Sequence, residues 1–241
     1  MSEIQQINNG SIDWTNFIDV FLITNGRGSF PYALESIRKQ KGIKFNLIIV
    51  KDKKWLDACN FCANYSNLSF YYRIDDDMFL NPYTFLFFNH LITKNKVKNV
   101  VVYHVKLWEP HRKRLANKVK IYNRKLTKKI GFEIDNRGKI DKIFNKKRKK
   151  RGYKYSGDKK SFVGIHAACN AKDNNRYTKL FGWKDGKDLK IRQKEIIKWD
   201  SALKKYPLPK QLEMSNKDLF EANKKNNSNF YRFINKVKGK L

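Results

Sequence analysis

Hydrophobic and polar positions in the first hundred residues form short apolar runs separated by longer amphipathic stretches. Four runs have the length and apolar content of buried strands: IDVFLIT (18–24), KFNLIIVKD (44–52), NLSFYYRI (67–74) and KNVVVYHV (98–105). The stretches between them have helical spacing: FPYALESIRKQ (30–40), KKWLDACNFCANY (53–65) and NPYTFLFFNHLI (81–92). Strands that alternate with helices predict right-handed crossovers and an α/β fold with a mostly parallel sheet.

The pattern is less regular after Trp108. KIGFEIDNRGKIDKIF (129–144) predicts a hairpin about 136–138, and the basic run 146–151 predicts an exposed loop. Further on, SFVGIHAACNA predicts a strand, LKIRQKEIIKWDSALKKY predicts a helix, and NFYRFINKVKGKL (229–241) predicts an amphipathic helix.

Positive charge dominates the composition. The 241 residues carry 53 Lys and Arg against 22 Asp and Glu, a net charge of +31. Residues 112–160 contain 21 of these basic residues and only 4 acids. This segment therefore predicts a surface that faces a polyanion, which could be nucleic acid, anionic lipid or a phosphorylated substrate.

Other features of the sequence bear on location. No apolar run approaches the ~20 residues that a membrane span requires. The first residues have neither a basic start nor an apolar core, so they do not resemble a secretory signal. Three cysteines are too few for a disulfide framework and predict a reducing, cytoplasmic location. Cys59 and Cys62 have a metal-like spacing, but they lie on an apolar helix face, which favours core packing over zinc.

Polar residues follow three of the predicted strands. Thr24, Asn25 and Arg27 follow the first, Asp52 ends the second, and the triplet Asp75-Asp76-Asp77 ends the third. Ligands of a parallel α/β sheet bind outside the carboxyl ends of the strands, so we expect these groups to lie side by side.

The acid triplet is notable in so basic a chain. Asp75 and Asp77 are two residues apart on an extended backbone, so they point to one side, roughly 6.5 Å apart. Two carboxylates at that distance repel by roughly 2–3 kcal/mol at an effective dielectric constant of about 20. A divalent cation would relieve this repulsion, and oxygen ligands suit Mg²⁺ or Mn²⁺. The alternative is that the acids cap the next helix and face water.

The run IDVFLITNGRGSFPYALESIRKQKGIKFNLIIVKD, followed by FYYRIDDDMFLNP, resembles the nucleotide-binding half of GT-A glycosyltransferases of the family 2 type. The resemblance is clearest from Ile18 to Phe88. It implies a GT-A fold in which Thr24, Asn25 and Arg27 line the nucleotide pocket and Asp52 contacts the nucleobase.

For the triplet, the resemblance implies that Asp77 is the direct metal ligand. Asp75 and Asp76 then contact the ribose and metal-bound water, with Asp75 a second candidate ligand. Lys51 and Lys53 flank Asp52 where the family often has an acid or a small residue, which is a departure from its pattern.

In the second half, GIHAACNAK, LFGWKD and IIKWDSALKKY follow the order of the family's acceptor-side motifs. Asp200 matches the general base, while Trp199 stands where a first acid is usual; Glu195 and Asp185 are alternative bases. His166 matches a further metal ligand that some GT-A enzymes supply from this region. Its alternative role is that of a buried histidine with a backbone partner.

The resemblance divides a single GT-A domain into a nucleotide-sugar half (1–107), an acceptor-side half with the basic insertion (108–210) and a basic amphipathic tail (211–241). It implies an Mn²⁺- or Mg²⁺-dependent transferase that uses a nucleotide-sugar, foremost a UDP-sugar, and a lipid-linked or surface-glycan acceptor. Residues 112–160 and the tail would hold it at the anionic inner face of a membrane. Alternatively, the tail docks on the domain.

The second hypothesis is a nucleic-acid-binding protein or a metal-dependent nuclease that uses residues 112–160 as its phosphate-binding face. It leaves the α/β half unexplained, and the sequence contains no recognised nucleic-acid motif. The aromatic residues near the triplet stand apart from the basic run, which predicts core positions rather than a base-stacking platform; they are Tyr71, Tyr72, Phe85, Phe87 and Phe88.

Overall fold

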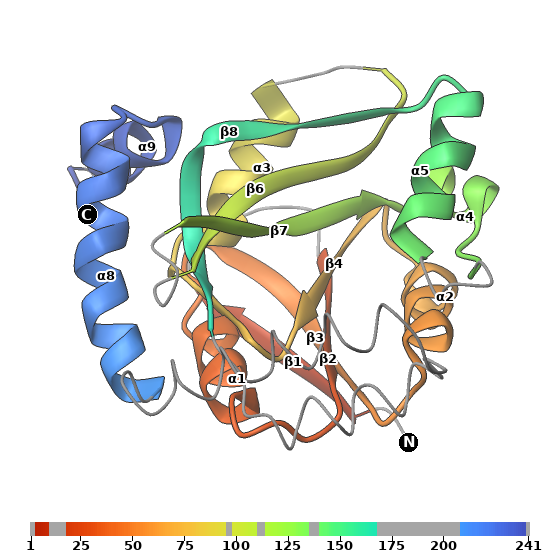
Figure 1. The fold of residues 1–241 in the computed structure, drawn as a ribbon, viewed down its shortest axis with the longest axis horizontal. Helices are drawn as coiled ribbons and strands as arrows, with labels where there is room; N and C mark the ends of the chain where they lie inside the picture. The colour runs from red at the N-terminus through yellow and green to blue at the C-terminus, as the bar shows by residue number, and fades with distance from the viewer. Residues whose placement is uncertain are drawn as a thin grey trace, which may run out of the picture.

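The computed structural model describes residues 3–9, 18–94, 98–109, 114–134, 140–167 and 208–239. The strands in these residues form one sheet in the order β1-β3-β2-β4-β7-β6-β8-β5 (Figure 1). Their bounds are β1 Glu3–Asn9, β2 Ile18–Thr24, β3 Ile43–Lys51, β4 Phe70–Asp75, β5 Met78–Leu80, β6 Val100–Glu109, β7 Arg114–Asn123 and β8 Lys154–His166.

The sheet is mixed. Strands β3, β2, β4, β6 and β8 run in one direction, whereas β1, β7 and β5 run against their neighbours. Strand β6, the fourth predicted strand, does not lie beside β4, because the unpredicted strand β7 pairs with both in antiparallel fashion.

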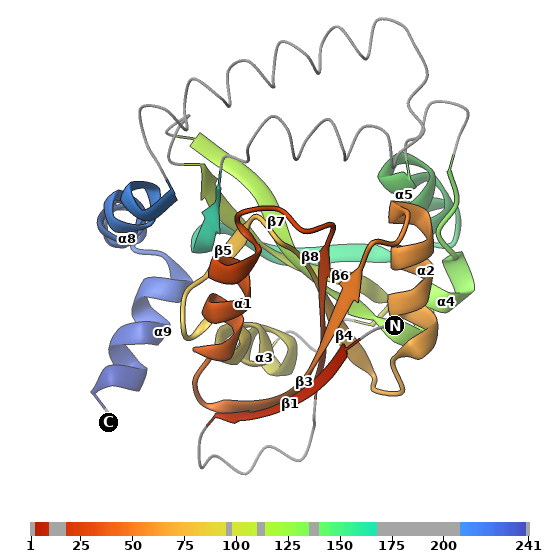
Figure 2. The same ribbon diagram turned by 90° about the horizontal axis from the view of Figure 1, so that it is seen from below.

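Helices cover both faces of the sheet (Figures 1 and 2). Alternate residues of a strand point to opposite faces: Val20 and Leu22 belong to the core beneath α1 (Phe30–Arg38) and α3 (Thr84–Lys94), whereas Phe21 and Ile23 belong to the core beneath α2 (Trp55–Tyr65). Cys59 and Cys62 are buried in this second core, and neither forms a disulfide with a described residue. The five aromatic residues predicted to be core are fully buried, which confirms that prediction.

The hairpin and the basic loop predicted for 129–151 are wrong. Residues 124–130 form α4 (Arg124–Ile130), and the basic run lies largely in α5 (Ile140–Lys150). Ile140 and Phe144, one helical turn apart, are buried, and the ring of Phe144 stacks on Phe132 with centroids 4.6 Å apart. The helix has an acid in its first turn and four basic residues in its last, so the charge run stabilises it through the helix dipole.

Strands β5 and β8 approach each other closely. Leu80 pairs with Gly164, and Met78 pairs with His166. A Cβ atom on Gly164 would overlap the carbonyl oxygen of Phe79 and lie 3.0 Å from the Cα of Leu80, so only glycine permits this approach. The pairing places His166 directly beside the acid triplet, with the backbone N–H of Ala167 donating to the carbonyl of Asp77 (2.8 Å).

Two C-terminal helices, α8 (Leu208–Lys225) and α9 (Asn229–Lys238), dock on β8. The side chain of Asn223 donates to the carbonyl of Phe162 (3.0 Å) and accepts from its N–H (3.1 Å). Phe230 is buried with its ring 5.0 Å from that of Phe87. The apolar face of α9 therefore packs on the domain, which is the alternative to a membrane-bound tail. No helix in the described part of the chain is both long and apolar enough to span a membrane.

Candidate functional site

The polar groups that follow the first three strands meet at one edge of the sheet. Strand β2 pairs with β4 so that Ile23 lies opposite Asp75, and the backbone N–H of Asp52 donates to the carbonyl of Thr24 (3.0 Å). The parallel arrangement β3-β2-β4 thus brings the loop after β2, Asp52 and the acid triplet together, as expected for a ligand site at strand ends.

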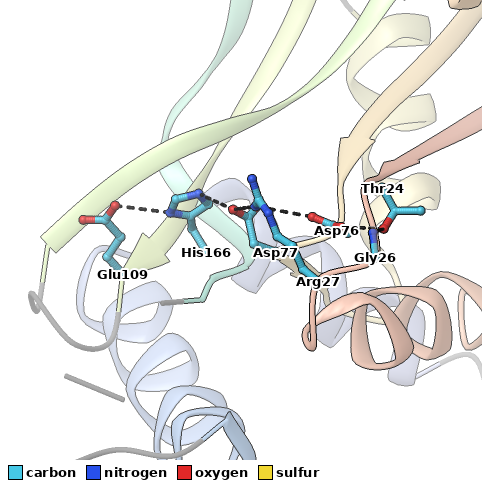
Figure 3. A network of polar contacts seen from close by, with 7 residues as sticks. All are labelled: Thr24, Gly26, Arg27, Asp76, Asp77, Glu109 and His166. Atoms are coloured by element: carbon cyan, nitrogen blue, oxygen red, sulfur yellow. Dashed lines mark hydrogen bonds and ion pairs between the residues drawn. The ribbon is translucent and has the colours of Figure 1, made fainter. Parts of the chain in front are cut away.

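Arg27 lies between two of the acids (Figure 3). Its Nη1 is 2.6 Å from Oδ2 of Asp77 and 3.3 Å from Oδ1 of Asp76. Asp76 also accepts a 2.6 Å hydrogen bond from the hydroxyl of Thr24, whose oxygen in turn accepts the N–H of Gly26. Gly26 has a φ of 81°, a conformation that glycine adopts without strain, and this turn directs Arg27 back to the acids.

The prediction that Asp75 and Asp77 share one side of an extended strand is wrong. Strand β4 ends at Asp75, and Asp76 and Asp77 form the turn that leads into β5. Asp75 is half-buried, while Asp76 and Asp77 are buried. Burial, together with the charge of Asp77, raises the pKa of Asp75 to about 6; burial also raises that of Asp76 to about 6, against the opposing effect of Arg27.

His166 connects the triplet to another acid. Its Nε2 is 3.5 Å from Oδ2 of Asp77, and its Nδ1 is 3.2 Å from Oε1 of Glu109. Burial alone would lower the pKa of His166, but Asp77 and Glu109 outweigh burial and raise that pKa to about 10. Two partners of His166 are thus side-chain carboxylates, whereas the alternative role considered from the sequence gave it a backbone partner.

Two further groups near Arg27 are buried without a hydrogen-bond partner among the described residues. They are Nδ2 of Asn25 and Oγ of Ser29, which occupies the N-cap position of α1 but makes no capping bond with its side chain. An unsatisfied buried polar group costs about 1–3 kcal/mol. A ligand that reaches these atoms would recover that free energy. Asp52, in contrast, is exposed and has a φ of 54°.

The candidate bases predicted from sequence, Asp200, Glu195 and Asp185, lie outside the described residues. The structure also adds Glu109, which sequence reasoning missed. One signal was available: Glu109 is the only acid between Asp77 and Glu133. Its proximity to His166 depends on pairing between β6 and β8, which local sequence patterns do not encode.

The donor set is suited to a hard divalent cation. Oδ2 of Asp77 and Nε2 of His166 are 3.5 Å apart, and neighbouring ligands of an octahedral Mg²⁺ or Mn²⁺ are about 3 Å apart. Among the described residues, no group of three or more His, Cys, Asp or Glu is already arranged to hold an ion. Arg27 supplies the positive charge instead. A metal cation bound at Asp77 would replace Arg27 as the positive partner of this carboxylate.

Parallel strands whose carboxyl ends carry a polar loop and an acid triplet, on a sheet covered by helices, define a fold similar to those of glycosyltransferases. The fold predicted from the sequence is thereby confirmed. No protein-family model and no curated protein matches the chain.

Among solved structures, residues 1–349 of the S. aureus glycosyltransferase TarS match with a TM-score of 0.52 and 14% identity. The match covers 68% of this chain and 64% of that one, so it spans less than two thirds of the TarS structure. The same TarS fragment in complex with UDP gives a TM-score of 0.47 at 15% identity, with the same shares covered. The mannosyltransferase PcManGT from Pyrobaculum calidifontis, in complex with GDP-Man and Mn²⁺, gives 0.49 at 12% identity, covering 95% of this chain and 81% of that one.

Replacing Arg27 with Met should destabilise the protein, because it leaves Asp76 buried without its cation and Asp77 with His166 as its remaining cationic contact in the described residues. Removal of one partner of a buried ion pair costs about 3–5 kcal/mol, which corresponds to a fall in melting temperature of roughly 6–20 °C for a chain of this size. Arg38→Met is the matched control, since Arg38 is exposed at the end of α1. Thermal unfolding followed by circular dichroism at neutral pH measures both, and equal melting temperatures would contradict the role of Arg27.

Proposed function

We propose that the protein is a metal-dependent glycosyltransferase that transfers a sugar from a nucleotide-sugar, foremost a UDP-sugar, to a glycan or lipid-linked acceptor. The observation that carries this proposal is the contact of Arg27 with Asp76 and Asp77 at the joined ends of β2 and β4, within a glycosyltransferase fold. It places a cation and two carboxylates where an α/β sheet binds its ligand.

The proposed donor site has a positive and a negative part. Arg27 provides a planar fork of donors that suits phosphate oxygens. Asp77 and His166 would hold the metal, with Asp75 as a further ligand, and Asp76 would contact the ribose or metal-bound water. Thr24, Asn25 and Asp52 would line the nucleotide side. The metal, when bound, would offset the negative charge that develops on the departing diphosphate.

A nucleoside diphosphate with Mn²⁺ should raise the melting temperature of the protein. At 100 times the dissociation constant, a ligand stabilises the native state by about 2.7 kcal/mol, or roughly 5–10 °C here. Asp77→Asn should abolish the shift, whereas Asp57→Asn, a change of an exposed acid on α2, should retain it. UDP, GDP and ADP are compared by differential scanning fluorimetry. The absence of a shift with every diphosphate would refute the donor site.

For the chemical step, we retain Asp200 as the base that deprotonates the acceptor hydroxyl, on the strength of the sequence resemblance. Asp200→Asn should lower sugar transfer by at least about 100-fold, the lower range for loss of a general base, while leaving the diphosphate-dependent melting shift unchanged. Transfer is measured as nucleoside diphosphate released in the presence of a crude glycan or lipid acceptor extract. Full activity of this variant would move the role to Glu195 or Asp185.

Exposed basic side chains gather on α4, on α5 and on the residues that lead from α5 into β8, and we call this region the basic surface. It comprises Lys125, Lys128, Lys129, Lys142, Lys146, Lys149, Lys150, Arg151 and Lys154. Helix α4 starts beside the amino end of β4, where the N–H of Arg124 donates to the carbonyl of Ser69. The acid triplet follows the other end of β4, about 16 Å away along the strand. The basic surface is therefore separate from the proposed donor site, and an anionic membrane face is the partner that we propose for it.

Replacement of Lys146, Lys149 and Lys150 with Gln should weaken sedimentation with phosphatidylserine vesicles by about 100-fold, at about 1 kcal/mol for each basic residue. The matched control replaces Lys224, Lys225 and Lys236, which are exposed on the C-terminal helices, and should have a smaller effect. Equal losses in both variants would show that charge alone, rather than the basic surface, governs binding. Salt-sensitive binding of RNA or DNA without vesicle binding would favour the nucleic-acid hypothesis.

A further inference from the structure

Glu109 is a buried acid at the end of β6, with 5% of its surface exposed. Burial of a carboxylate costs several kcal/mol unless charged or hydrogen-bonding partners compensate for it. The resemblance to glycosyltransferases assigns no role to this position. Its Oε1 lies 3.2 Å from Nδ1 of His166.

If a metal replaced one of the two ring hydrogens of His166, the contact with Glu109 would determine which nitrogen keeps the other. An ionised carboxylate can only accept hydrogen bonds, so Nδ1 must be the donor. Nε2 is then the ring nitrogen that can meet a metal, and it is the nitrogen 3.5 Å from Oδ2 of Asp77 (Figure 3). Metal-binding histidines commonly donate their other ring N–H to a carboxylate, which fixes the orientation of the ring and strengthens the ligand.

The pairing of three strands brings Glu109, His166 and Asp77 together. The pairing of β5 with β8 sets Met78 opposite His166, immediately after Asp77 in the chain. The pairing of β6 with β8 sets Trp108 opposite Ile165, so Glu109 follows on β6 as His166 follows on β8. Gly164 allows β8 to approach β5 closely enough for this register. The backbone thus places Glu109, His166 and Asp77 side by side, and the orientation of the His166 ring depends on its side-chain contacts with the two acids.

We propose that Glu109 is a positioning residue that holds His166 with Nε2 toward Asp77 and thereby sets the affinity of the site for a divalent cation. This inference rests on the proposed function, because it assumes that Asp77 and His166 bind the metal. A purely structural role, in which Glu109 does no more than pair with His166 and support the fold, is the alternative that the experiment must separate.

The test measures Mn²⁺ binding alone, without nucleotide, from the electron paramagnetic resonance signal of free Mn²⁺. Glu109→Gln preserves the size of the side chain and should weaken Mn²⁺ binding by about 10- to 100-fold, the usual effect of removing a partner of a metal-binding histidine. Glu133→Gln is the matched control, because Glu133 is exposed and pairs with Lys147 away from the site; it should bind Mn²⁺ like the wild type.

A double-mutant cycle separates positioning from support of the fold. In a His166→Gln background, Glu109→Gln should have no further effect on Mn²⁺ affinity, because the residue acts through His166. Long-range ¹⁵N–¹H spectra of the Mg²⁺-saturated wild type should show His166 with its hydrogen on Nδ1, and Glu109→Gln should shift this pattern. Glu109→Ala provides a second variant if the glutamine variant does not fold.

The outcomes distinguish the two proposals. If the wild type does not bind Mn²⁺, the metal dependence in the proposed function fails. If the wild type binds Mn²⁺ and Glu109→Gln binds it equally well, the role of Glu109 fails while the donor site stands. An additive loss of affinity in the double mutant would likewise overturn positioning through His166.

Discussion

Negative charge buried at the carboxyl ends of β2 and β4 is the constraint on which the surrounding structure depends. Asp76 and Asp77 are almost fully buried, and carboxylates in that state require a cation or several hydrogen bonds. Gly26 allows the loop after β2 to turn back so that Arg27 reaches both acids. Gly164 allows β8 to bring His166 to the other side of Asp77. Both glycines thus serve the same electrostatic requirement.

The strands and helices that depend on the local spacing of apolar residues were predicted from the sequence. The βα units from Ile18 to Lys94 were predicted because each buried strand and each amphipathic helix is continuous in sequence. The insertion of β7 between β4 and β6 was not predicted, because strand order depends on contacts between distant segments. In α5, the charge run concealed the pair Ile140 and Phe144, whose one-turn spacing was the better guide.

The candidate site also combines features that local sequence determines with features that depend on contacts between distant segments. Thr24, Arg27 and Asp77 could be placed together from sequence because each follows a strand of a parallel sheet. The geometry within the triplet could not, because β4 ends at Asp75 and a turn begins where an extended strand was assumed. Glu109 was missed since its strand was expected to end at Val105, and its partner His166 is 57 residues away.

In a chain with 53 Lys and Arg, it matters that the residue paired with Asp76 and Asp77 is an arginine rather than a lysine. Any exposed acid cluster in such a protein would attract flexible lysines, which bind as point charges without a fixed direction. Here the acids are buried, and one guanidinium on a short loop contacts both of them. Guanidinium pairs with phosphate in the same forked geometry as with carboxylate. Under the proposed function, a diphosphate bound together with a metal would give Asp77 a new cation and Arg27 a new anion, so neither charge would be left buried without a partner.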